Sequence, residues 1–153
     1  MKILVVSDTH GDVRALLDAV SRESGCAMII HLGDGERDTG PLAYLPDPKP
    51  LLQVRGNCDF YSDLPESVVT TEGGKTIYCT HGHTQMVKYG PAMLRQTASE
   101  KHADIALYGH THVPVQTYED GMYLCNPGSL RQGDYAVLEI VPSGIMWLPK
   151  RIY

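Results

Sequence analysis

Short apolar segments rich in valine and isoleucine recur along the chain, and polar or turn-forming residues follow each of them. Uninterrupted apolar runs of this length, bounded by turn residues, are typical of buried or half-buried β-strands. The pattern predicts strands over residues 3–6, 27–30, 51–54, 68–71, 76–79 and 105–108.

Helices are predicted in two places. Asp12 can cap the first helix, whose apolar residues recur at helical spacing, and Gly25 can end it. The second helix is predicted to have Pro91 in its first turn and to run to about His102. A strand, a helix and a second strand in succession favour parallel pairing of the strands. The apolar positions of the first helix are Val13, Leu16, Leu17 and Val20.

Turn-forming pairs separate strand-like runs at Gly73-Gly74, Asp120-Gly121 and Ser143-Gly144. Such pairs are typical of tight antiparallel hairpins, so both parallel and antiparallel strands are expected. Residues 41–50 contain four prolines and are interpreted as a loop that crosses the surface. Because no repeat or linker divides the chain, we expect a single domain over residues 1–153.

The composition narrows the class of protein. With 153 residues, of which 42% are hydrophobic and 20% charged, the chain can bury a core of its own. Its net charge of −5 opposes binding to duplex nucleic acid or anionic lipid. No apolar run is long enough to span a membrane and no signal peptide is recognisable, so a cytoplasmic protein is expected. The four cysteines form no C-x-x-C pair, which argues against a disulfide framework or a zinc ribbon.

Polar motifs directly follow predicted strands at five places. Because the carboxyl ends of parallel strands face one crevice, motifs that are distant in sequence can meet there. Aspartate, asparagine and histidine side chains together suit Mn, Fe, Zn, Ni or Co better than Mg or Ca. The motifs are Ser7-Asp8-Thr9-His10, Gly33-Asp34, Gly56-Asn57-Cys58-Asp59, His81-Gly82-His83 and Gly109-His110-Thr111-His112.

Seven of these side chains are candidate metal ligands, too many for one tetrahedral ion but suited to two ions that share a carboxylate. Two ions about 3.5–4 Å apart suit in-line phosphoryl displacement. Each motif alone also has a structural explanation, such as a helix cap beside a surface histidine or an ordinary turn. Their joint occurrence favours the functional interpretation. The candidates are Asp8, His10, Asp34, Asn57, His81, His110 and His112.

The ordered motifs D-x-H, G-D, G-N-x-D, H-G-H and G-H-T-H, from Asp8 to His112, resemble those of the calcineurin-like metallophosphoesterase superfamily. The turn Asn126-Pro127-Gly128-Ser129 resembles one in the small single-domain phosphodiesterase branch of that superfamily, and we interpret it as a structural turn near the site. The resemblance implies an α/β fold, a four-layer αββα sandwich of two mixed β-sheets flanked by helices.

The resemblance also implies how the ligands are divided between two divalent transition-metal ions. Mn²⁺ is the expected ion, with Fe, Zn, Ni or Co as alternatives. A water shared by two cations would become hydroxide at neutral pH and attack phosphorus in line. One ion would be held by Asp8, His10, Asp34 and His112, and the second by Asp34, Asn57, His81 and His110.

The candidate catalytic residues are Asp34, Asn57, Cys58 and His83. Many members of the superfamily have a histidine as general acid directly after the asparagine, where this chain has Cys58. A thiol is a weaker proton donor, so good leaving groups are favoured. His83 is the alternative donor, or else a supporting or surface group. Arg37 and Arg55 are candidates for contact with a substrate phosphate, and Asp59 is interpreted as orienting its own loop.

The function that follows is hydrolysis of a small phosphodiester, with no duplex nucleic acid and no membrane as partner. The oligomeric state stays open, with a homodimer as the commonest assembly of such a domain. Two alternatives stay open. One is a phosphomonoesterase, and the other is a non-catalytic, metal-binding interaction scaffold, because the retromer subunit of this fold resembles the same branch. The chain lacks G-x-G-x-x-G after its first strand and lacks H-x-H-x-D-H, which argues against a dinucleotide-binding module and a metallo-β-lactamase-type hydrolase.

Overall fold

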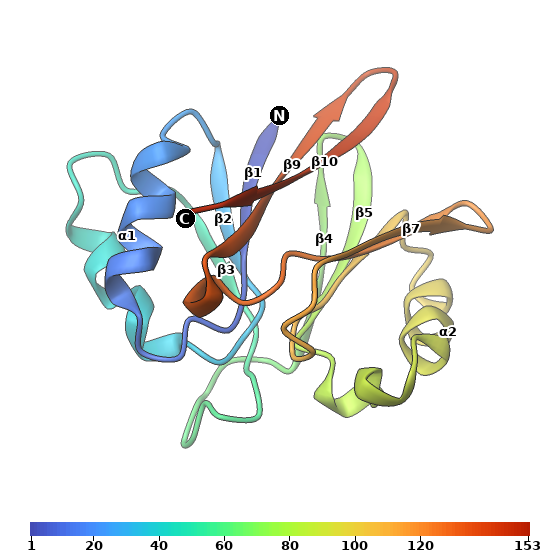
Figure 1. Ribbon diagram of the computed structural model, residues 1–153. Coiled ribbons are helices and arrows are strands. Elements are labelled where there is room, and N and C mark those ends of the chain that lie inside the picture. Colours follow the sequence, from blue (N-terminus) through green and yellow to red (C-terminus); the bar gives the residue numbers. More distant parts are fainter.

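The computed structural model describes residues 1–153 and contains two mixed five-stranded β-sheets (Figure 1). Helix α1 (Val13–Arg22) covers the outer face of one sheet, and α2 (Ala92–Glu100) covers that of the other. The four-layer αββα sandwich implied by the sequence is therefore confirmed. All six predicted strands are present, with ends that differ by no more than one residue, and so are the three predicted hairpins.

The first sheet has the strand order β10-β9-β1-β2-β3. Its strands β1 (Lys2–Val6), β2 (Met28–His31) and β3 (Leu51–Gln53) run parallel. The long hairpin of β9 (Asp134–Val141) and β10 (Gly144–Arg151) adds antiparallel strands beside β1. The parallel part of the sheet thus comes from the first third of the chain.

The second sheet has the strand order β4-β5-β6-β8-β7. Its three central strands run parallel, and the two edge strands are antiparallel to their neighbours. This sheet is built from the middle of the chain, residues 67–126. Its strands are β4 (Ser67–Glu72), β5 (Lys75–Thr80), β6 (Ile105–Leu107), β7 (Val115–Glu119) and β8 (Met122–Asn126).

The strands β1 and β2 of the first sheet are buried on both faces, which explains their uninterrupted apolar sequences. Alternate side chains of β1 point to opposite faces. Ile3 and Val5 belong to the core between the sheets, whereas Leu4 and Val6 pack with Leu16 of α1. The fully buried Leu16 side chain contributes roughly 1.5–3 kcal/mol to the free energy of unfolding.

The second sheet repeats this arrangement. Ile77 and Cys79 of β5 face the core between the sheets, and Tyr78 faces outward against Leu94 and Ala98 of α2. The sandwich therefore has three apolar layers, which fix both sheets in place and determine where their strands end.

The helix prediction is confirmed in both places and corrected in a third. The Asp12 side chain accepts the backbone N–H of Ala15 at 3.0 Å as the N-cap of α1, and α2 follows Pro91. The proline-rich loop prediction is wrong for its first part, because Pro41 lies inside the 3₁₀ helix η1 (Glu36–Tyr44) and Leu42 packs in the core beneath α1. Shorter 3₁₀ helices are η2 (His83–Gln85), η3 (Val87–Tyr89) and η4 (Leu130–Gln132).

No helix in the structure has the length and apolar character needed to cross a membrane. All four cysteines are free; Cys26, Cys79 and Cys125 are buried and Cys58 is exposed. Burial raises the pKa of the Cys79 and Cys125 thiols to about 12, so these two act as small apolar side chains.

Backbone hydrogen bonds join the loops that leave the carboxyl ends of strands in both sheets. Asp8 N–H donates to the Gly33 carbonyl at 3.0 Å, which joins the loops after β1 and β2. Gly109 N–H donates to the His81 carbonyl at 3.0 Å, which joins the loops after β5 and β6. His110 N–H donates to Asp8 Oδ2 at 3.1 Å and connects the two pairs. The polar motifs therefore meet at the carboxyl ends of strands, as expected, and these strands belong to both sheets.

Candidate metal centre

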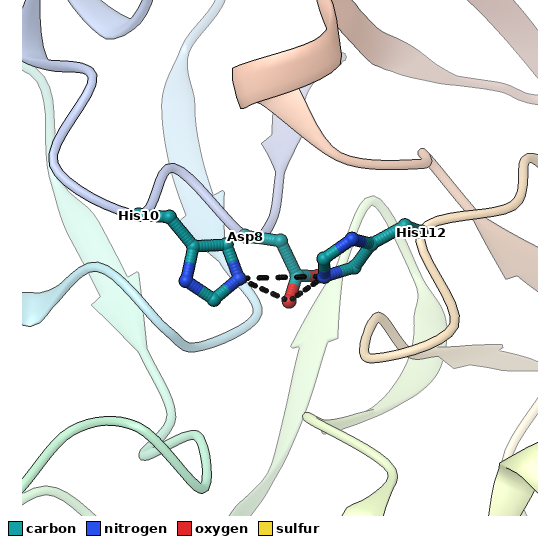
Figure 2. A group of neighbouring side chains, drawn as sticks. All are labelled: Asp8, His10 and His112. Carbon is teal, nitrogen blue, oxygen red and sulfur yellow. Dashed lines mark hydrogen bonds and ion pairs between the residues drawn. The ribbon is translucent and has the colours of Figure 1, made fainter.

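The first group of donors consists of Asp8, His10 and His112, which lie around one carboxylate oxygen (Figure 2). Asp8 Oδ1 is 3.4 Å from His10 Nε2 and 3.1 Å from His112 Nε2. The two imidazole nitrogens are 3.3 Å apart. Two ligand atoms about 2.1 Å from one ion at a right angle lie about 3 Å apart, so this group matches the spacing that one transition-metal ion requires.

The second group consists of Asp34, His81 and His110, whose donor atoms all lie within 4.8 Å of one another. Asp34 Oδ2 is 3.2 Å from His81 Nε2. Asn57 Oδ1 is 3.0 Å from the same imidazole nitrogen and adds a neutral oxygen donor. These four side chains are those expected to hold the second ion.

Asp34 lies between the two groups. Its Oδ2 atom is 3.7 Å from His10 Nε2 and 3.2 Å from His81 Nε2. The structure therefore brings all seven sequence-predicted ligands together, with the shared carboxylate in the middle. Cys58 is a further donor in reach, because its sulfur lies within 4.8 Å of donor atoms of His10 and Asp34.

Most of the donor residues have an unusual backbone conformation. A positive φ is uncommon outside glycine and costs of order 1 kcal/mol or more at each position. Such strain gathers at functional sites, where the surrounding structure enforces it. The strained donors are Asp8 (φ 54°), His10 (45°), Asp34 (59°), His110 (69°) and His112 (60°).

The two carboxylates of the site are buried, with Asp8 0% and Asp34 3% exposed. Ser7 Oγ donates to Asp8 Oδ2 at 2.6 Å, and Cys58 N–H donates to Asp34 Oδ1 at 2.7 Å. Burial alone would raise the pKa of Asp34, but the hydrogen bond and charge of His81, together with the Cys58 N–H, hold it well below its ordinary value. The Asp34 carboxyl is thus ionised and attracts a cation.

The imidazoles differ in protonation. Burial would lower the pKa of His81, but its hydrogen bond with Asp34 and the charges of Asp8 and Asp34 raise it overall. Burial and the charge of His81 lower the pKa of His110 to about 4, so its lone pair is free at neutral pH. The two carboxylates thus favour positive charge beside them, which a protonated His81 or bound divalent cations can supply.

Asp59 holds two donor loops together. Its carboxylate accepts four backbone N–H groups, from Asp34 at 2.8 Å, Gly35 at 3.0 Å, Glu36 at 3.1 Å and Gly56 at 2.8 Å. The sequence predicts that Asp59 orients its own loop, which the Gly56 contact confirms. The structure adds that the same carboxylate fixes the loop of Asp34.

The turn at residues 126–129 makes hydrogen bonds to the donor loops, so it is the structural turn near the site that the sequence leads us to expect. Asn126 Nδ2 donates to the Gly109 carbonyl at 3.0 Å and to Thr111 Oγ1 at 3.1 Å. Ser129 Oγ donates to the Asp8 carbonyl at 2.8 Å. This turn therefore connects the loop of His110 and His112 with the loop of Asp8.

A cleft of about 350 Å³ opens beside the donors. Arg37 lines it, as predicted for a phosphate contact, and no carboxylate pairs with its guanidinium. Arg55 does not line it; its guanidinium pairs with Glu66 at 2.5 Å. Phe60, which belongs to none of the sequence motifs, also lines the cleft with 72% of its surface exposed.

The two candidate proton donors, Cys58 and His83, lie in different surroundings. Cys58 lines the cleft, and partial burial of its sulfur and the charge of Asp34 raise the pKa of its thiol. The His83 ring lies 5.4 Å from that of His81 and 6.1 Å from that of His110. Burial and the charge of His81 lower the pKa of His83, and its buried Nδ1 has no hydrogen-bond partner.

Comparisons with known proteins agree with this geometry. A family model described as a calcineurin-like phosphoesterase superfamily domain matches residues 1–141. The chain is 34% identical over 132 residues to the probable metallophosphoesterase YsnB of Bacillus subtilis (strain 168), covering 86% of this chain and 76% of that protein. It is 30% identical over 154 residues to the phosphodiesterase YfcE of Escherichia coli (strain K12), covering 85% and 79%.

Solved structures show the same fold. A predicted phosphoesterase from Streptococcus pneumoniae TIGR4 superposes with a TM-score of 0.78 at 31% sequence identity, covering 97% of each chain. Wild-type Vps29 of Entamoeba histolytica, complexed with Zn²⁺, superposes with a TM-score of 0.75 at 21% identity, covering 100% of each chain. The second likeness concerns the fold alone.

Replacing Asp59 by asparagine tests its role in holding the site. The amide keeps one oxygen but turns an NH₂ group toward two of the four N–H donors, which lose their acceptor. We expect Asp59→Asn to lower the free energy of unfolding of the metal-free protein by about 2–4 kcal/mol, measured in urea. The control Asp63→Asn, at an exposed position in the same segment, should change it by less than about 0.5 kcal/mol. Equal stabilities of the two variants would contradict this role.

Proposed function

This chain belongs to the calcineurin-like phosphoesterase superfamily, and from that premise we propose that it is a dinuclear metal-dependent phosphodiesterase acting on small phosphodiesters. The observation that carries the proposal is the pair of donor groups around Asp34, whose carboxylate lies within 3.7 Å of an imidazole nitrogen on each side. A relative of this chain, YfcE, is named a phosphodiesterase.

The donor set fits two divalent transition-metal ions. Carboxylate, amide and imidazole donors lie at the mutual spacing of ligands, and strained backbone holds five of them there. When bound, two such cations supply an activated water at neutral pH and neutralise charge on the phosphoryl oxygens. Asp8, His10, Asp34 and His112 would hold one ion, and Asp34, Asn57, His81 and His110 would hold the other.

The protein orients these donors before any ion binds. Cys58 N–H occupies Asp34 Oδ1 and leaves Oδ2 to face His10 and His81. His81 Nδ1 donates to the Leu32 carbonyl at 2.7 Å, which directs Nε2 toward Asp34 and Asn57. Fixing a ligand imidazole through its other nitrogen is a common device of metal sites and sets both its tautomer and its angle.

The leaving group receives little help from acids in the cleft. The raised pKa of Cys58 keeps its thiol protonated at neutral pH but makes it a weak donor. The lowered pKa of His83 keeps its imidazole neutral. We therefore propose that the enzyme prefers substrates whose leaving group is stable as an anion, such as a phenolate.

The charges of the cleft favour a diester over a monoester. Arg37 is the cleft's single arginine, and the carboxylates of Glu36, Asp38 and Asp59 lie along the same wall. Beyond the two ions, these residues add net negative charge, which repels a monoester with nearly two negative charges more strongly than a diester with one. Phe60 adds an exposed aromatic face, which suits a diester with an aryl or nucleobase group.

A non-catalytic scaffold is the second candidate function, because Vps29 structures share the fold. The filled set of seven donors favours metal binding, which both candidates include. The two candidates differ in turnover, which hydrolysis of model esters measures.

Hydrolysis by metal-stripped protein refilled with Mn²⁺ tests the proposal. We expect bis(p-nitrophenyl) phosphate to be cleaved faster than p-nitrophenyl phosphate, and only with metal. The double variant Asn57→Ala, His110→Ala should lose more than about 100-fold in kcat/KM, beyond the range for losing an outer hydrogen-bond partner. His102→Ala removes an exposed imidazole outside the site and should keep full activity.

Two outcomes would contradict the proposal. Faster cleavage of the monoester would keep the reaction class and overturn the preference for diesters. Binding of Mn²⁺ without cleavage of either ester would overturn catalysis and favour the scaffold.

Phe60 and Tyr61 form a matched pair for the substrate preference, because both are exposed and only Phe60 lines the cleft. We expect Phe60→Leu to raise KM for bis(p-nitrophenyl) phosphate about 3- to 10-fold through the loss of aromatic contact, with little change in kcat. Tyr61→Leu should leave both constants unchanged. Steady-state kinetics that show the same KM for both variants would rule out an aryl contact by Phe60.

A further inference from the structure

A chain of buried hydrogen bonds runs beneath the candidate metal centre, and none of its side chains is a proposed ligand. Its three side chains come from different segments: Thr9 from the loop after β1, His31 from the end of β2, and Asp38 from η1. They are 0%, 1% and 7% exposed, respectively, so little water can replace their bonds. Buried polar groups of this kind are costly unless all of their bonds are made.

The direction of each bond in the chain follows from its end at Gly33. Gly33 N–H donates to His31 Nδ1 at 3.1 Å, so Nδ1 is an acceptor. Burial lowers the pKa of His31 to about 4, so the neutral ring carries its one proton on Nε2. That nitrogen is 3.1 Å from Thr9 Oγ1, to which it donates. The Thr9 hydroxyl in turn donates to Asp38 Oδ2 at 2.5 Å, and Gly11 N–H donates to the same oxygen at 2.9 Å.

The bonded positions flank the proposed ligands. Thr9 lies between Asp8 and His10 in the sequence, and Gly33 directly precedes Asp34. His31 therefore joins the segment that carries two ligands of the first group to the segment that carries the shared carboxylate.

Close packing also prevents the side chains of Thr9 and His31 from shifting relative to one another. A side chain at Gly35 would collide with Thr9 Oγ1 and come within 2.7 Å of His31 Nε2. The packing thus holds the imidazole and the hydroxyl at one separation.

We propose that Thr9, His31 and Asp38 form a positioning relay that sets the separation between the Asp8–His10 segment and Asp34, and through it the affinity for metal. The inference rests on the proposed dinuclear site, since the relay has a functional effect only if these side chains hold ions. The three residues are positioning residues, because they act on the proposed ligands through hydrogen bonds and are not ligands themselves.

Thr9 and Thr39 offer a matched comparison of positioning with simple stabilisation. Both hydroxyls are buried and each makes two hydrogen bonds, but those of Thr39 go to the Glu36 carbonyl and to Gln53 and do not join the Asp8–His10 segment to Asp34. Threonine to valine removes the hydroxyl at nearly constant volume. The measured quantities are the Kd for Mn²⁺, by isothermal titration calorimetry, and the urea midpoint of the metal-free protein.

We expect Thr9→Val to weaken Mn²⁺ binding about 10-fold or more, the range seen when partners that orient metal ligands are lost. Thr39→Val should keep the Kd for Mn²⁺ within about twofold of the wild-type value. It should lower the urea midpoint about as much as Thr9→Val does. Equal Kd values for the two variants, at similar loss of stability, would overturn the relay and leave the three residues a structural role only.

Substitutions at His31 and Asp38 keep the test decisive if Thr9→Val does not fold. His31→Asn can keep the acceptor for Gly33 and loses the donor to Thr9, and His31→Gln does the reverse, so each should weaken Mn²⁺ binding. Asp38→Asn can still accept from Thr9 and Gly11 and should bind Mn²⁺ nearly as wild type does, whereas Asp38→Leu should not. Wild-type affinity in both His31 variants and in Asp38→Leu would overturn the relay.

Failure of the relay and failure of the proposed function give different results. If the wild-type chain binds no Mn²⁺, the dinuclear site is wrong and the relay fails with it. If the wild type binds two ions and cleaves a diester while the relay variants bind equally well, only the relay is wrong.

Discussion

Two buried carboxylates at the junction of the sheets are the constraint on which the rest of this structure depends. Asp8 and Asp34 are almost completely removed from water. A buried carboxylate is tolerated only with hydrogen bonds and compensating positive charge. Backbone N–H groups and Ser7 supply the hydrogen bonds, and the two carboxylates raise the pKa of the neighbouring His81. The imidazoles around the two carboxylates form a site that can hold divalent cations.

The sandwich stabilises this arrangement because it holds the ends of its strands in fixed positions. Three apolar layers hold the two sheets rigidly, so that loops from both sheets can meet over a short distance. Polar contacts then join the loops to one another. They are the hydrogen bonds of Asp59, those of Asn126 and Ser129, and the buried hydrogen bonds of His31. The strained backbone of the donor residues is stable because all of these contacts act together.

The sequence predicts the local features well and the tertiary contacts poorly. Apolar runs such as residues 105–108 identify their strands because burial on both faces leaves a continuous signal. The donors cluster as expected because each directly follows a strand. The reach of Asp59, the bonds of His31 and the exposure of Phe60 have no local signal, since each depends on which segments the fold brings together. The ion pair of Arg55 also has no local signal, because its guanidinium donates to the carboxylate of Glu66, 11 positions away.

Anomalous X-ray diffraction from crystals equilibrated with Mn²⁺ tests the central claim most directly, because it counts and locates ions without relying on activity. The account predicts two Mn²⁺ ions per chain, about 3.5–4 Å apart, on either side of the Asp34 carboxylate. Asp34→Asn crystals should lose occupancy at both positions, since both ions share that carboxylate. A single ion, no ion, or two ions that do not contact Asp34 in the wild-type protein would contradict the dinuclear site.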